Sequence, residues 1–387
     1  MNNADKQYLN LLEKVMEQPE RSDRTGTGTR SLFGYQMRFH NLENEFPLLT
    51  TKRVYWKGVV HELLWMLRGE TNIKPLVDNN VSIWTAWPHK NYVKVTGNDI
   101  SIEEYENRIR TDAEFAAEHG DIGPCYGYQW RKWLAGYCYE NELFPSKEFR
   151  STGESSGSDD HFGCDIRGSF CWTDSLEKKE IDQVKNSIDS LRSNPNNRRN
   201  LISAWNVADL AEMEVAGLPP CHCFVQFYTR KLTPTERISR LPEYRGTTTY
   251  GEFLQGDLDA EKVLLDLAKG QGIPEYYLDS QVYIRSNDLL LGAPFNIAQY
   301  ALMNHLFASC VNMIPGELVY TIGDAHIYSN HYDQVKEQLS RDIAEKSPQV
   351  TIEKYDENYL YPWELTAENI KLHNYNPQAS IKAEVAV

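Results

Sequence analysis

Apolar positions mark out several long helices and strands along the chain. Residues 1–20 look like an amphipathic helix at the N-terminus. Residues 59–67 are almost entirely apolar and predict a buried helix, whereas residues 221–228 form an apolar, aromatic run that predicts a buried strand. A further strand at residues 278–284 and an apolar helix that continues to Val311 complete the strongest patterns.

Shorter patterns predict further elements between these. Residues 31–34 and 201–205 predict strands, and residues 181–191 predict a helix. Residues 46–53, which finish with two cationic side chains, predict the end of a strand.

Three polar, charged stretches interrupt the apolar pattern, at about residues 88–120, 134–178 and 231–276. The first contains a helical pattern near residues 102–110, and the third contains one near residues 260–269. We expect all three to be surface excursions. The length of 387 residues permits two or three domains, or one domain with insertions.

Composition and charge exclude some classes of function. The net charge of −15 argues against a general nucleic-acid binder, because phosphate neutralisation needs a basic surface, although a small anionic ligand on a local arginine cluster stays possible. No apolar run approaches the roughly 18 residues of a membrane span, and the N-terminus lacks the apolar core of a signal peptide. Seven cysteines at irregular spacing fit a reducing cytoplasm, so we expect a cytoplasmic protein.

The second excursion contains Cys138, His161, Cys164 and Cys171. Such residue types can bind zinc, but no CxxC pair is present among them. We therefore expect no metal site.

Cys221 is the strongest candidate for chemistry. A proline pair, Pro219-Pro220, places it at the start of the apolar strand, and His222 follows it directly. With cationic neighbours this cysteine could be a thiolate nucleophile. The alternative is an inert, small apolar side chain, which is what most free cysteines are.

Glu62 lies inside the apolar helix, where an isolated charge is costly. It is either a structural partner of another polar group or a proton-transfer group with a raised pKa. Trp84 and Trp87 lie three positions apart and are either core residues or a platform for a flat heterocycle.

Several segments suit an anionic nucleotide. The Gly- and Thr-rich residues 21–29, which include Arg24, form either a phosphate-binding loop or an ordinary turn. Arg198 and Arg199 match a bidentate grip on a phosphate, or are solvated charges. Asn296, in a Gly/Pro turn, has the donor and the acceptor needed to read the imide edge of a pyrimidine.

Taken together, these segments resemble the thymidylate synthase family. The resemblance rests on twelve short motifs in the family's order, which cover most of the chain apart from the three excursions: RTGTGT, TTKR, HELLW, the IW…W pair, YGYQWR, NRR, LISAWN, LPPCH, RSND, LGAPFNIA, GDAHIYSNH and the terminal IKAEVAV.

The resemblance implies one-carbon transfer to C5 of dUMP from 5,10-methylenetetrahydrofolate, without a metal. It implies an α/β fold, with one large mixed sheet flanked by helices and an exposed sheet face that packs against a partner in a homodimer. It also implies one thymidylate synthase-like domain over residues 1–387, with the three excursions as insertions. No membrane or nucleic-acid partner is implied.

The resemblance also implies roles for individual residues. Cys221 resembles the nucleophile that adds to C6 of the pyrimidine, and Glu62 resembles the proton-transfer glutamate. The other catalytic matches are Tyr126, His222 and Asp288. The residues that match ligands of dUMP are Arg24, Arg198, Arg199, Gln226, Arg285, Ser286, Asn296, His326 and Tyr328, with Arg198 and Arg199 reaching the partner's site. The residues that match the folate site are Lys52, Trp84, Trp87, Asp288, Gly292, Phe295, Ala386 and Val387, the last two as a closing tail.

Four positions depart from the family pattern. Ile284 replaces a common glutamine, Asn287 replaces a small residue, Tyr55 replaces a histidine and Gln299 replaces a serine. Ile284, Asn287 and the insertions resemble enzymes that give 5-hydroxymethyl-dUMP, as in phages that modify their DNA. Trp84 and the intact C-terminal tail favour a dry site and therefore hydride transfer, which gives dTMP. We expect methylation, with deoxyuridylate hydroxymethylation as the alternative.

Overall fold

The computed structural model describes residues 2–22, 26–137, 177–215, 219–242, 258–353 and 361–384. Some residues singled out from the sequence lie outside these ranges: Arg24, Cys138, His161, Cys164, Cys171, Ala386 and Val387.

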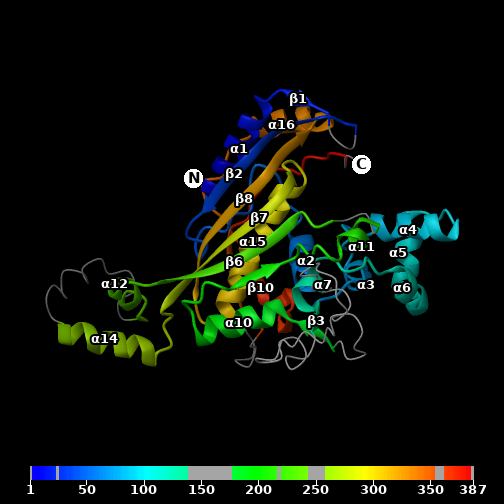
Figure 1. Cartoon of the computed structure of the whole chain (residues 1–387). Helices are drawn as coiled ribbons and strands as arrows, with labels where there is room; N and C mark the ends of the chain where they lie inside the picture. The colour runs from blue at the N-terminus through cyan, green and yellow to red at the C-terminus, as the bar shows by residue number, and fades with distance from the viewer. Residues whose placement is uncertain are drawn as a thin grey trace, which may run out of the picture.

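A six-stranded sheet forms the centre of the fold, in the order β1-β2-β8-β7-β6-β5 (Figure 1). Strands β7 and β8 are parallel, and the other neighbouring pairs in this sheet are antiparallel. The strands are β1 (Glu20–Arg21), β2 (Thr29–Phe39), β5 (Leu201–Ser203), β6 (His222–Lys231), β7 (Tyr276–Asp288) and β8 (Ile314–Tyr328). The expected α/β fold on one large mixed sheet is confirmed, as are the strands predicted at residues 31–34, 201–205, 221–228 and 278–284.

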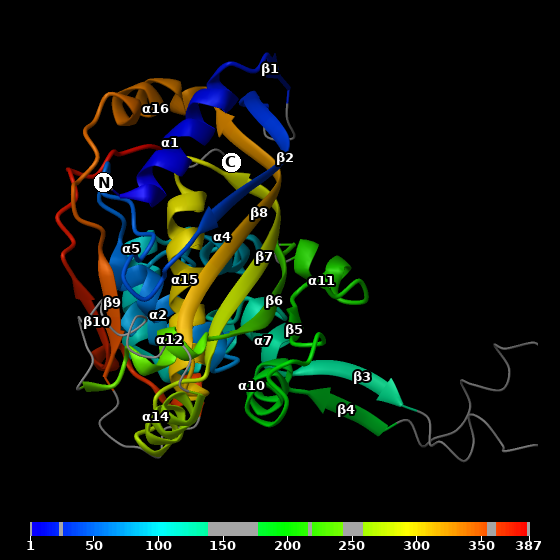
Figure 2. The same cartoon turned by 90° about the vertical axis from the view of Figure 1, so that its left-hand side faces the viewer.

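One face of the sheet is covered by helices (Figure 2). Helix α15 (Gly292–Cys310) packs on β7 and β8, α1 (Asn3–Met16) packs on β2, and α2 (Trp56–Leu67) packs against α15. Because α15 is apolar on almost all sides, it is buried along nearly its whole length. These three helices confirm the N-terminal, buried and apolar helices that the sequence predicts.

The opposite face of the sheet carries exposed apolar side chains. Phe227 stacks on Phe307 of α15, so its neighbour Tyr228 points to the other face and is 63% exposed. Gln226 lies on the same face of the sheet as Tyr228. Leu201, which pairs with Gln226 across the strands, is 42% exposed. Phe33 of β2 is 82% exposed.

The strand end predicted at residues 46–53 is wrong, because this segment is irregular. Pro47 has no N–H for a ladder. The N–H groups and hydroxyls of Thr50 and Thr51 donate instead to the buried carboxylate of Asp5 in α1, over 2.7–3.1 Å. A tertiary contact therefore takes the hydrogen bonds that a strand would need.

Residues 88–120 are only partly exposed. Most of them fall within three helices, α4 (Ala86–Thr96), α5 (Ile102–Thr111) and α6 (Ala113–His119). Tyr92, Tyr105 and Phe115 are buried between these helices, with ring centroids 5.3–5.7 Å apart. The charged residues of the segment lie around this aromatic cluster.

The other two excursions are described only in part, and Figure 1 shows α12 (Pro234–Ile238) and α14 (Leu258–Gly270) of the third at one end of the molecule. Strand β3 (Trp133–Tyr137) pairs with β4 (Glu177–Ile181) on either side of the second excursion. In the third, α12 and α14 share a small apolar cluster that is separate from the main core. The organisation as one domain with insertions stays a prediction.

The remaining elements surround this framework: α3 (Lys74–Asp78), α7 (Tyr126–Arg131), α10 (Gln183–Ser193), α11 (Leu210–Val215), η2 (Ser329–His331), α16 (Tyr332–Leu339), η3 (Pro362–Glu364), η4 (Ala367–Asn369), and a two-stranded sheet of β9 (Gln349–Ile352) and β10 (Ile370–His373). The helices predicted at residues 102–110, 181–191 and 260–269 correspond to α5, α10 and α14. Of the helices in the described ranges, none has the length and apolar character that crossing a membrane requires.

Candidate active site

Cys221 lies directly before β6, where hydrogen bonds fix both of its main-chain polar groups. Its N–H donates to the hydroxyl oxygen of Tyr126 over 2.9 Å, and its carbonyl accepts from the N–H of Arg285 over 2.8 Å. The register of β6 against β7 shifts between His222 and Phe224, an irregularity of the kind that redirects side chains at a strand end. The thiol is free and partly buried, and its main chain is fixed at both polar groups.

Arg285 connects β7 to the segment that precedes the cysteine. Its guanidinium donates to the carbonyls of Pro219 and Pro220, over 3.0 and 2.9 Å, and lies 5.6 Å from the ring centroid of Trp205. Burial raises the pKa of the Cys221 thiol, whereas the positive charge of Arg285 lowers it. The net direction is upward.

Glu62 projects from α2 and is buried. Its Oε1 accepts from the indole N–H of Trp84 and its Oε2 accepts from the amide of Gln299, each over 2.6 Å. Burial raises the pKa of Glu62 to about 7, against the opposing effect of both hydrogen bonds. A carboxyl group that titrates near neutral pH can both accept and return a proton.

His222 is buried and uncharged at neutral pH. Burial lowers its pKa to about 4, although a hydrogen bond with the Asn296 side chain acts in the opposite direction. The imidazole lies 4.8 Å from the ring of Tyr126 and 5.3 Å from that of Tyr300. Its Nδ1 has no hydrogen-bond partner among the described protein atoms, so it can bind water or substrate.

Asn296 lies on the first turns of α15 and joins two polar groups. Its side chain also interacts with the hydroxyl of Tyr320, and that hydroxyl donates to Oδ1 of Asn287 over 2.7 Å. Burial raises the pKa of Tyr320, so the phenol stays protonated. A Cβ at Gly292 would lie 3.1 Å from Nδ2 of Asn287, so a small residue keeps this turn open.

The carboxyl ends of β7 and β8 bring four of the predicted site residues to one edge of the sheet. The two strands are parallel, with Asp288 opposite His326 in register, and Ser286 lies two positions earlier on β7. The His326 ring is 5.0 Å from the ring of Tyr328. Hydroxyl, imidazole and carboxylate groups therefore share this edge.

The loop after Asp288 is held from three sides. The Asp288 carboxylate accepts from the N–H groups of Leu290 and Leu291, over 2.8 and 3.2 Å. The Tyr8 hydroxyl donates to the Leu289 carbonyl over 2.6 Å, and the ammonium of Lys52 donates to the Leu290 carbonyl. Lys52 is buried beneath this loop, and its burial lowers the pKa of the ammonium group to about 8.

Aromatic side chains form one wall beside Glu62. Trp84 is buried and lies 5.5 Å from Trp87, which is 36% exposed. Phe295 and Tyr55 both lie against Gly58 of α2, where an added Cβ would meet their rings at 3.3 and 2.6 Å. A flat heterocycle fits such a partly exposed aromatic surface.

Three predicted dUMP ligands lie away from Cys221. Arg198 and Arg199 are exposed in the turn that precedes β5, and neither takes part in an ion pair with the residues that the structure describes. Gln226 lies further along β6, and its amide donates to the Arg198 carbonyl over 3.2 Å.

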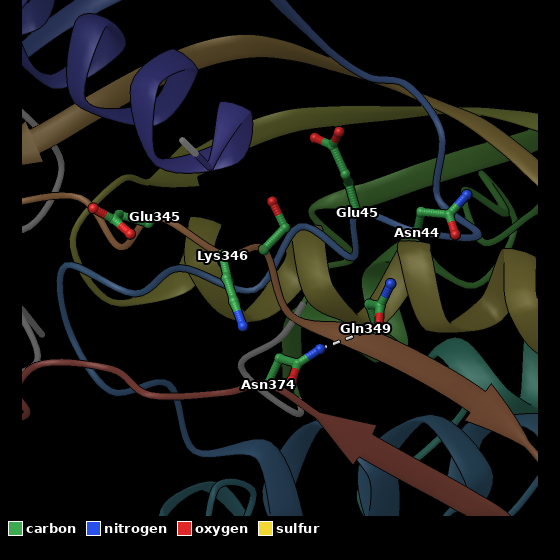
Figure 3. Close-up of a pocket in the computed structure, with 7 residues that line it drawn as sticks. Asn44, Glu45, Glu345, Lys346, Gln349 and Asn374 are labelled. Atoms are coloured by element: carbon green, nitrogen blue, oxygen red, sulfur yellow. Dashed lines mark hydrogen bonds between the residues drawn. The ribbon is translucent and has the colours of Figure 1, made fainter.

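A separate polar groove lies elsewhere on the surface (Figure 3). It is lined by Asn44, Glu45, Glu345, Lys346, Ser347, Gln349 and Asn374. The amide of Asn374 donates to Gln349 over 3.2 Å. None of the predicted site residues lines this groove, so we assign it no role.

Some contacts at the site involve residues for which the sequence predicts no role. Trp205 contacts Arg285, Tyr300 contacts His222, and His331 contacts the tail. His331 Nε2 lies 2.7 Å from the Glu384 carbonyl, next to the predicted closing tail. A signal for Tyr300 was present, since it lies one helical turn after Asn296.

Comparison with known proteins places the chain in a family. The family model described as thymidylate synthase matches residues 6–387. A thymidylate synthase of Mycoplasma genitalium is 35% identical over 384 residues, which cover 99% of this chain and 100% of that protein. A thymidylate synthase of Sphingopyxis alaskensis is 37% identical over 382 residues, covering 98% and 97% of the two chains. These matches confirm the resemblance read from the motifs: the chain belongs to the thymidylate synthase family of one-carbon-transferring enzymes.

Proposed function

We propose that this protein catalyses the reductive methylation of dUMP at C5, with 5,10-methylenetetrahydrofolate as co-substrate, and gives dTMP and dihydrofolate. The observation that carries the proposal is the setting of Cys221. Its main-chain groups are fixed by Tyr126 and Arg285, and the guanidinium of Arg285 supplies positive charge beside the thiol. The relatives bear the name thymidylate synthase.

The thiolate of Cys221 forms a bond to C6 of the uracil ring, and the electron pair of the C5–C6 double bond shifts toward C5 and O4. This makes C5 the nucleophile for the one-carbon unit. Asn296 holds the O4 and N3 edge, and Glu62 moves a proton on the O4 side. C5 then bonds to the one-carbon unit and loses its own hydrogen as a proton, which is the step that tritium release reports. When hydride reaches the one-carbon unit, the C6–S bond breaks and the thiolate returns.

The folate supplies the one-carbon unit and then a hydride. The aromatic wall of Trp84, Trp87 and Phe295 fits its flat ring system, because Trp87 is partly exposed above the buried Trp84. Asp288 lies at the edge of the same region and can contact a polar ring edge. Closure of the site against water decides whether hydride or water reaches the one-carbon unit.

The comparisons support methylation, and nothing in them favours the hydroxymethyl alternative. The test is to incubate the protein with 5-tritiated dUMP and 5,10-methylenetetrahydrofolate. We expect tritium release, formation of dTMP by mass and a rise in dihydrofolate absorbance. A Cys221→Ser variant that releases tritium at the wild-type rate, or wild-type protein that releases none, refutes the proposal. A product 16 mass units heavier than dTMP, with no dihydrofolate, assigns hydroxymethylation instead.

We also propose a homodimer that is formed through the open face of the sheet. Exposed apolar side chains such as Phe33 and Tyr228 are costly to leave in water, and a second sheet face would cover them. Arg198 and Arg199, which are exposed, would then reach the phosphate in the partner's site. Mixing an inactive Cys221→Ser chain with an inactive Arg198→Ala chain should restore part of the activity, because each mixed dimer contains one intact site. A cytoplasmic location stays a prediction.

A further inference from the structure

Two donors from different parts of the chain fix the Glu62 carboxylate. The indole of Trp84 binds Oε1 and the amide of Gln299 binds Oε2, each over 2.6 Å. All three residues are buried: Glu62 is 7% exposed, Trp84 8% and Gln299 1%. Because each oxygen has its own donor, the carboxylate cannot rotate without breaking a buried hydrogen bond.

Gln299 reaches Glu62 from the same face of α15 that carries Asn296. The two amides are three residues apart in this helix, so they lie on neighbouring turns of one face. Asn296 interacts with His222, whose ring lies 4.8 Å from that of Tyr126 beside the cysteine. A single helix face therefore contacts both the proton-transfer carboxyl group and the pyrimidine-reading edge of the site.

We propose that Gln299 is a positioning residue: it fixes the orientation of the Glu62 carboxylate and favours its ionised form. The catalytic meaning of this role rests on the proposed function, but the contact itself does not. Serine, which the family commonly has at this position, has too short a side chain to span the distance that glutamine spans. The direct amide contact is thus a feature of this sequence.

The hydrogen bonds from Trp84 and Gln299 are the main interactions that stabilise the ionised form of Glu62. Burial is the largest influence and raises the pKa of Glu62, and the bonds from Trp84 and Gln299 oppose it. The titratable groups that face it are the Cys125 thiol before α7 and the Tyr300 phenol on α15, whose own pKa values the Glu62 charge raises. Within the described ranges, no lysine, arginine or histidine forms an ion pair with it. The cationic and titratable groups elsewhere on α2 are Lys57 and His61, with Arg68 at its C-terminal end.

The indole N–H of Trp84 provides a reporter of this charge. Its 15N and 1H chemical shifts in the NMR spectrum respond to ionisation of the carboxylate that it binds, and a Trp84→Phe spectrum identifies the signal. In wild-type protein we expect a titration midpoint near pH 7. In Gln299→Met, which removes the donor at similar volume, we expect the midpoint to rise by about 1 pH unit, because the lost hydrogen bond favours the ionised form.

Gln299→Leu provides a second donor-free variant in case the first does not fold. The control is Met66→Leu, because the Met66 sulfur lies 3.9 Å from the Gln299 amide and makes no hydrogen bond to Glu62. The control should keep the wild-type midpoint. A wild-type midpoint in both Gln299 variants would overturn the proposal.

The pH dependence of kcat with dUMP then tests the catalytic part. The limb that Glu62 controls should move upward by the same amount as the NMR midpoint. If the wild-type protein does not turn over dUMP, the proposed function fails, while the titration still decides the role of Gln299. If the protein is active but the limb does not move with the midpoint, the catalytic part of this inference is wrong.

Discussion

Replacing Glu62 by glutamine should abolish a loss of stability that wild type undergoes as the pH rises, and it should also remove activity. Glu62 has a pKa of about 7 in the folded protein, against an ordinary value of 4.5. A carboxyl group with the higher pKa in the folded state binds its proton more tightly there. The stability that wild type has at low pH is therefore lost as the pH rises from about 4.5 to 7, and the loss is complete above pH 7.

The magnitude follows from the size of this difference. A difference of about 2.5 in pKa corresponds to about 3 kcal/mol at 1.36 kcal/mol per unit. Between pH 5 and pH 8, the free energy of unfolding of wild type should therefore fall by about 2 to 3 kcal/mol relative to that of Glu62→Gln. The glutamine side chain has one oxygen in place of two, so it can accept from only one of the donors of Trp84 and Gln299. The free-energy cost of the lost hydrogen bond does not depend on pH.

The assay is urea denaturation of both proteins at pH 5 and pH 8, at one protein concentration because an oligomer's stability depends on it. Glu103→Gln, an exposed change on α5, controls for the substitution itself. A difference between wild type and Glu62→Gln that is equal at the two pH values would contradict a raised pKa at this site. Tritium release from 5-tritiated dUMP should be lost in Glu62→Gln at both pH values.

Three further predictions follow from other contacts. Arg285→Gln removes the cation that lowers the pKa of Cys221. Alkylation of this thiol by iodoacetamide at pH 8, followed by peptide mass, should therefore slow several-fold. An unchanged rate would show that the cation does not act on the thiol. Asp5→Ala leaves the buried N–H groups of Thr50 and Thr51 without an acceptor. The free energy of unfolding, measured by urea titration, should therefore fall by about 3 to 5 kcal/mol. A loss below about 1 kcal/mol would mean that water replaces the carboxylate. Tyr228→Glu places a charge on the open sheet face and should shift sedimentation toward the monomer; a sedimentation coefficient equal to that of wild type would place the interface elsewhere.

The long apolar patterns predicted the main elements because their signal is local. Residues 59–67 and the run after Cys221 could be assigned from periodicity, since burial on all sides or on one face leaves a direct trace in the sequence. Residues 46–53 could not, because their conformation depends on the carboxylate of Asp5, which lies far away in sequence. Hydrogen bonds that replace a strand ladder leave no periodic pattern.

The site residues also divide into those that local sequence identifies and those that depend on distant contacts. The motif order identified Cys221 and Glu62, but periodicity alone left each with an inert alternative. The contact between Gln299 and Glu62 had no local signal, because the partner of Gln299 lies on another helix, far away in sequence. Lys52 was expected beside the folate, and its burial against the Leu290 carbonyl depends on tertiary packing that no short motif encodes.

Arg285 explains why a proline pair and an arginine belong to the same site. The two prolines have no N–H groups to donate to a strand ladder, and their carbonyls accept from the guanidinium of Arg285. Together with the N–H that binds the Cys221 carbonyl, this residue holds three consecutive carbonyls. A guanidinium has five N–H donors, so three remain for an anionic ligand. Lysine has a single flexible ammonium and could not hold two carbonyls in a fixed plane while also binding a phosphate. The guanidinium of Arg285 therefore cannot move without moving the segment that carries Cys221.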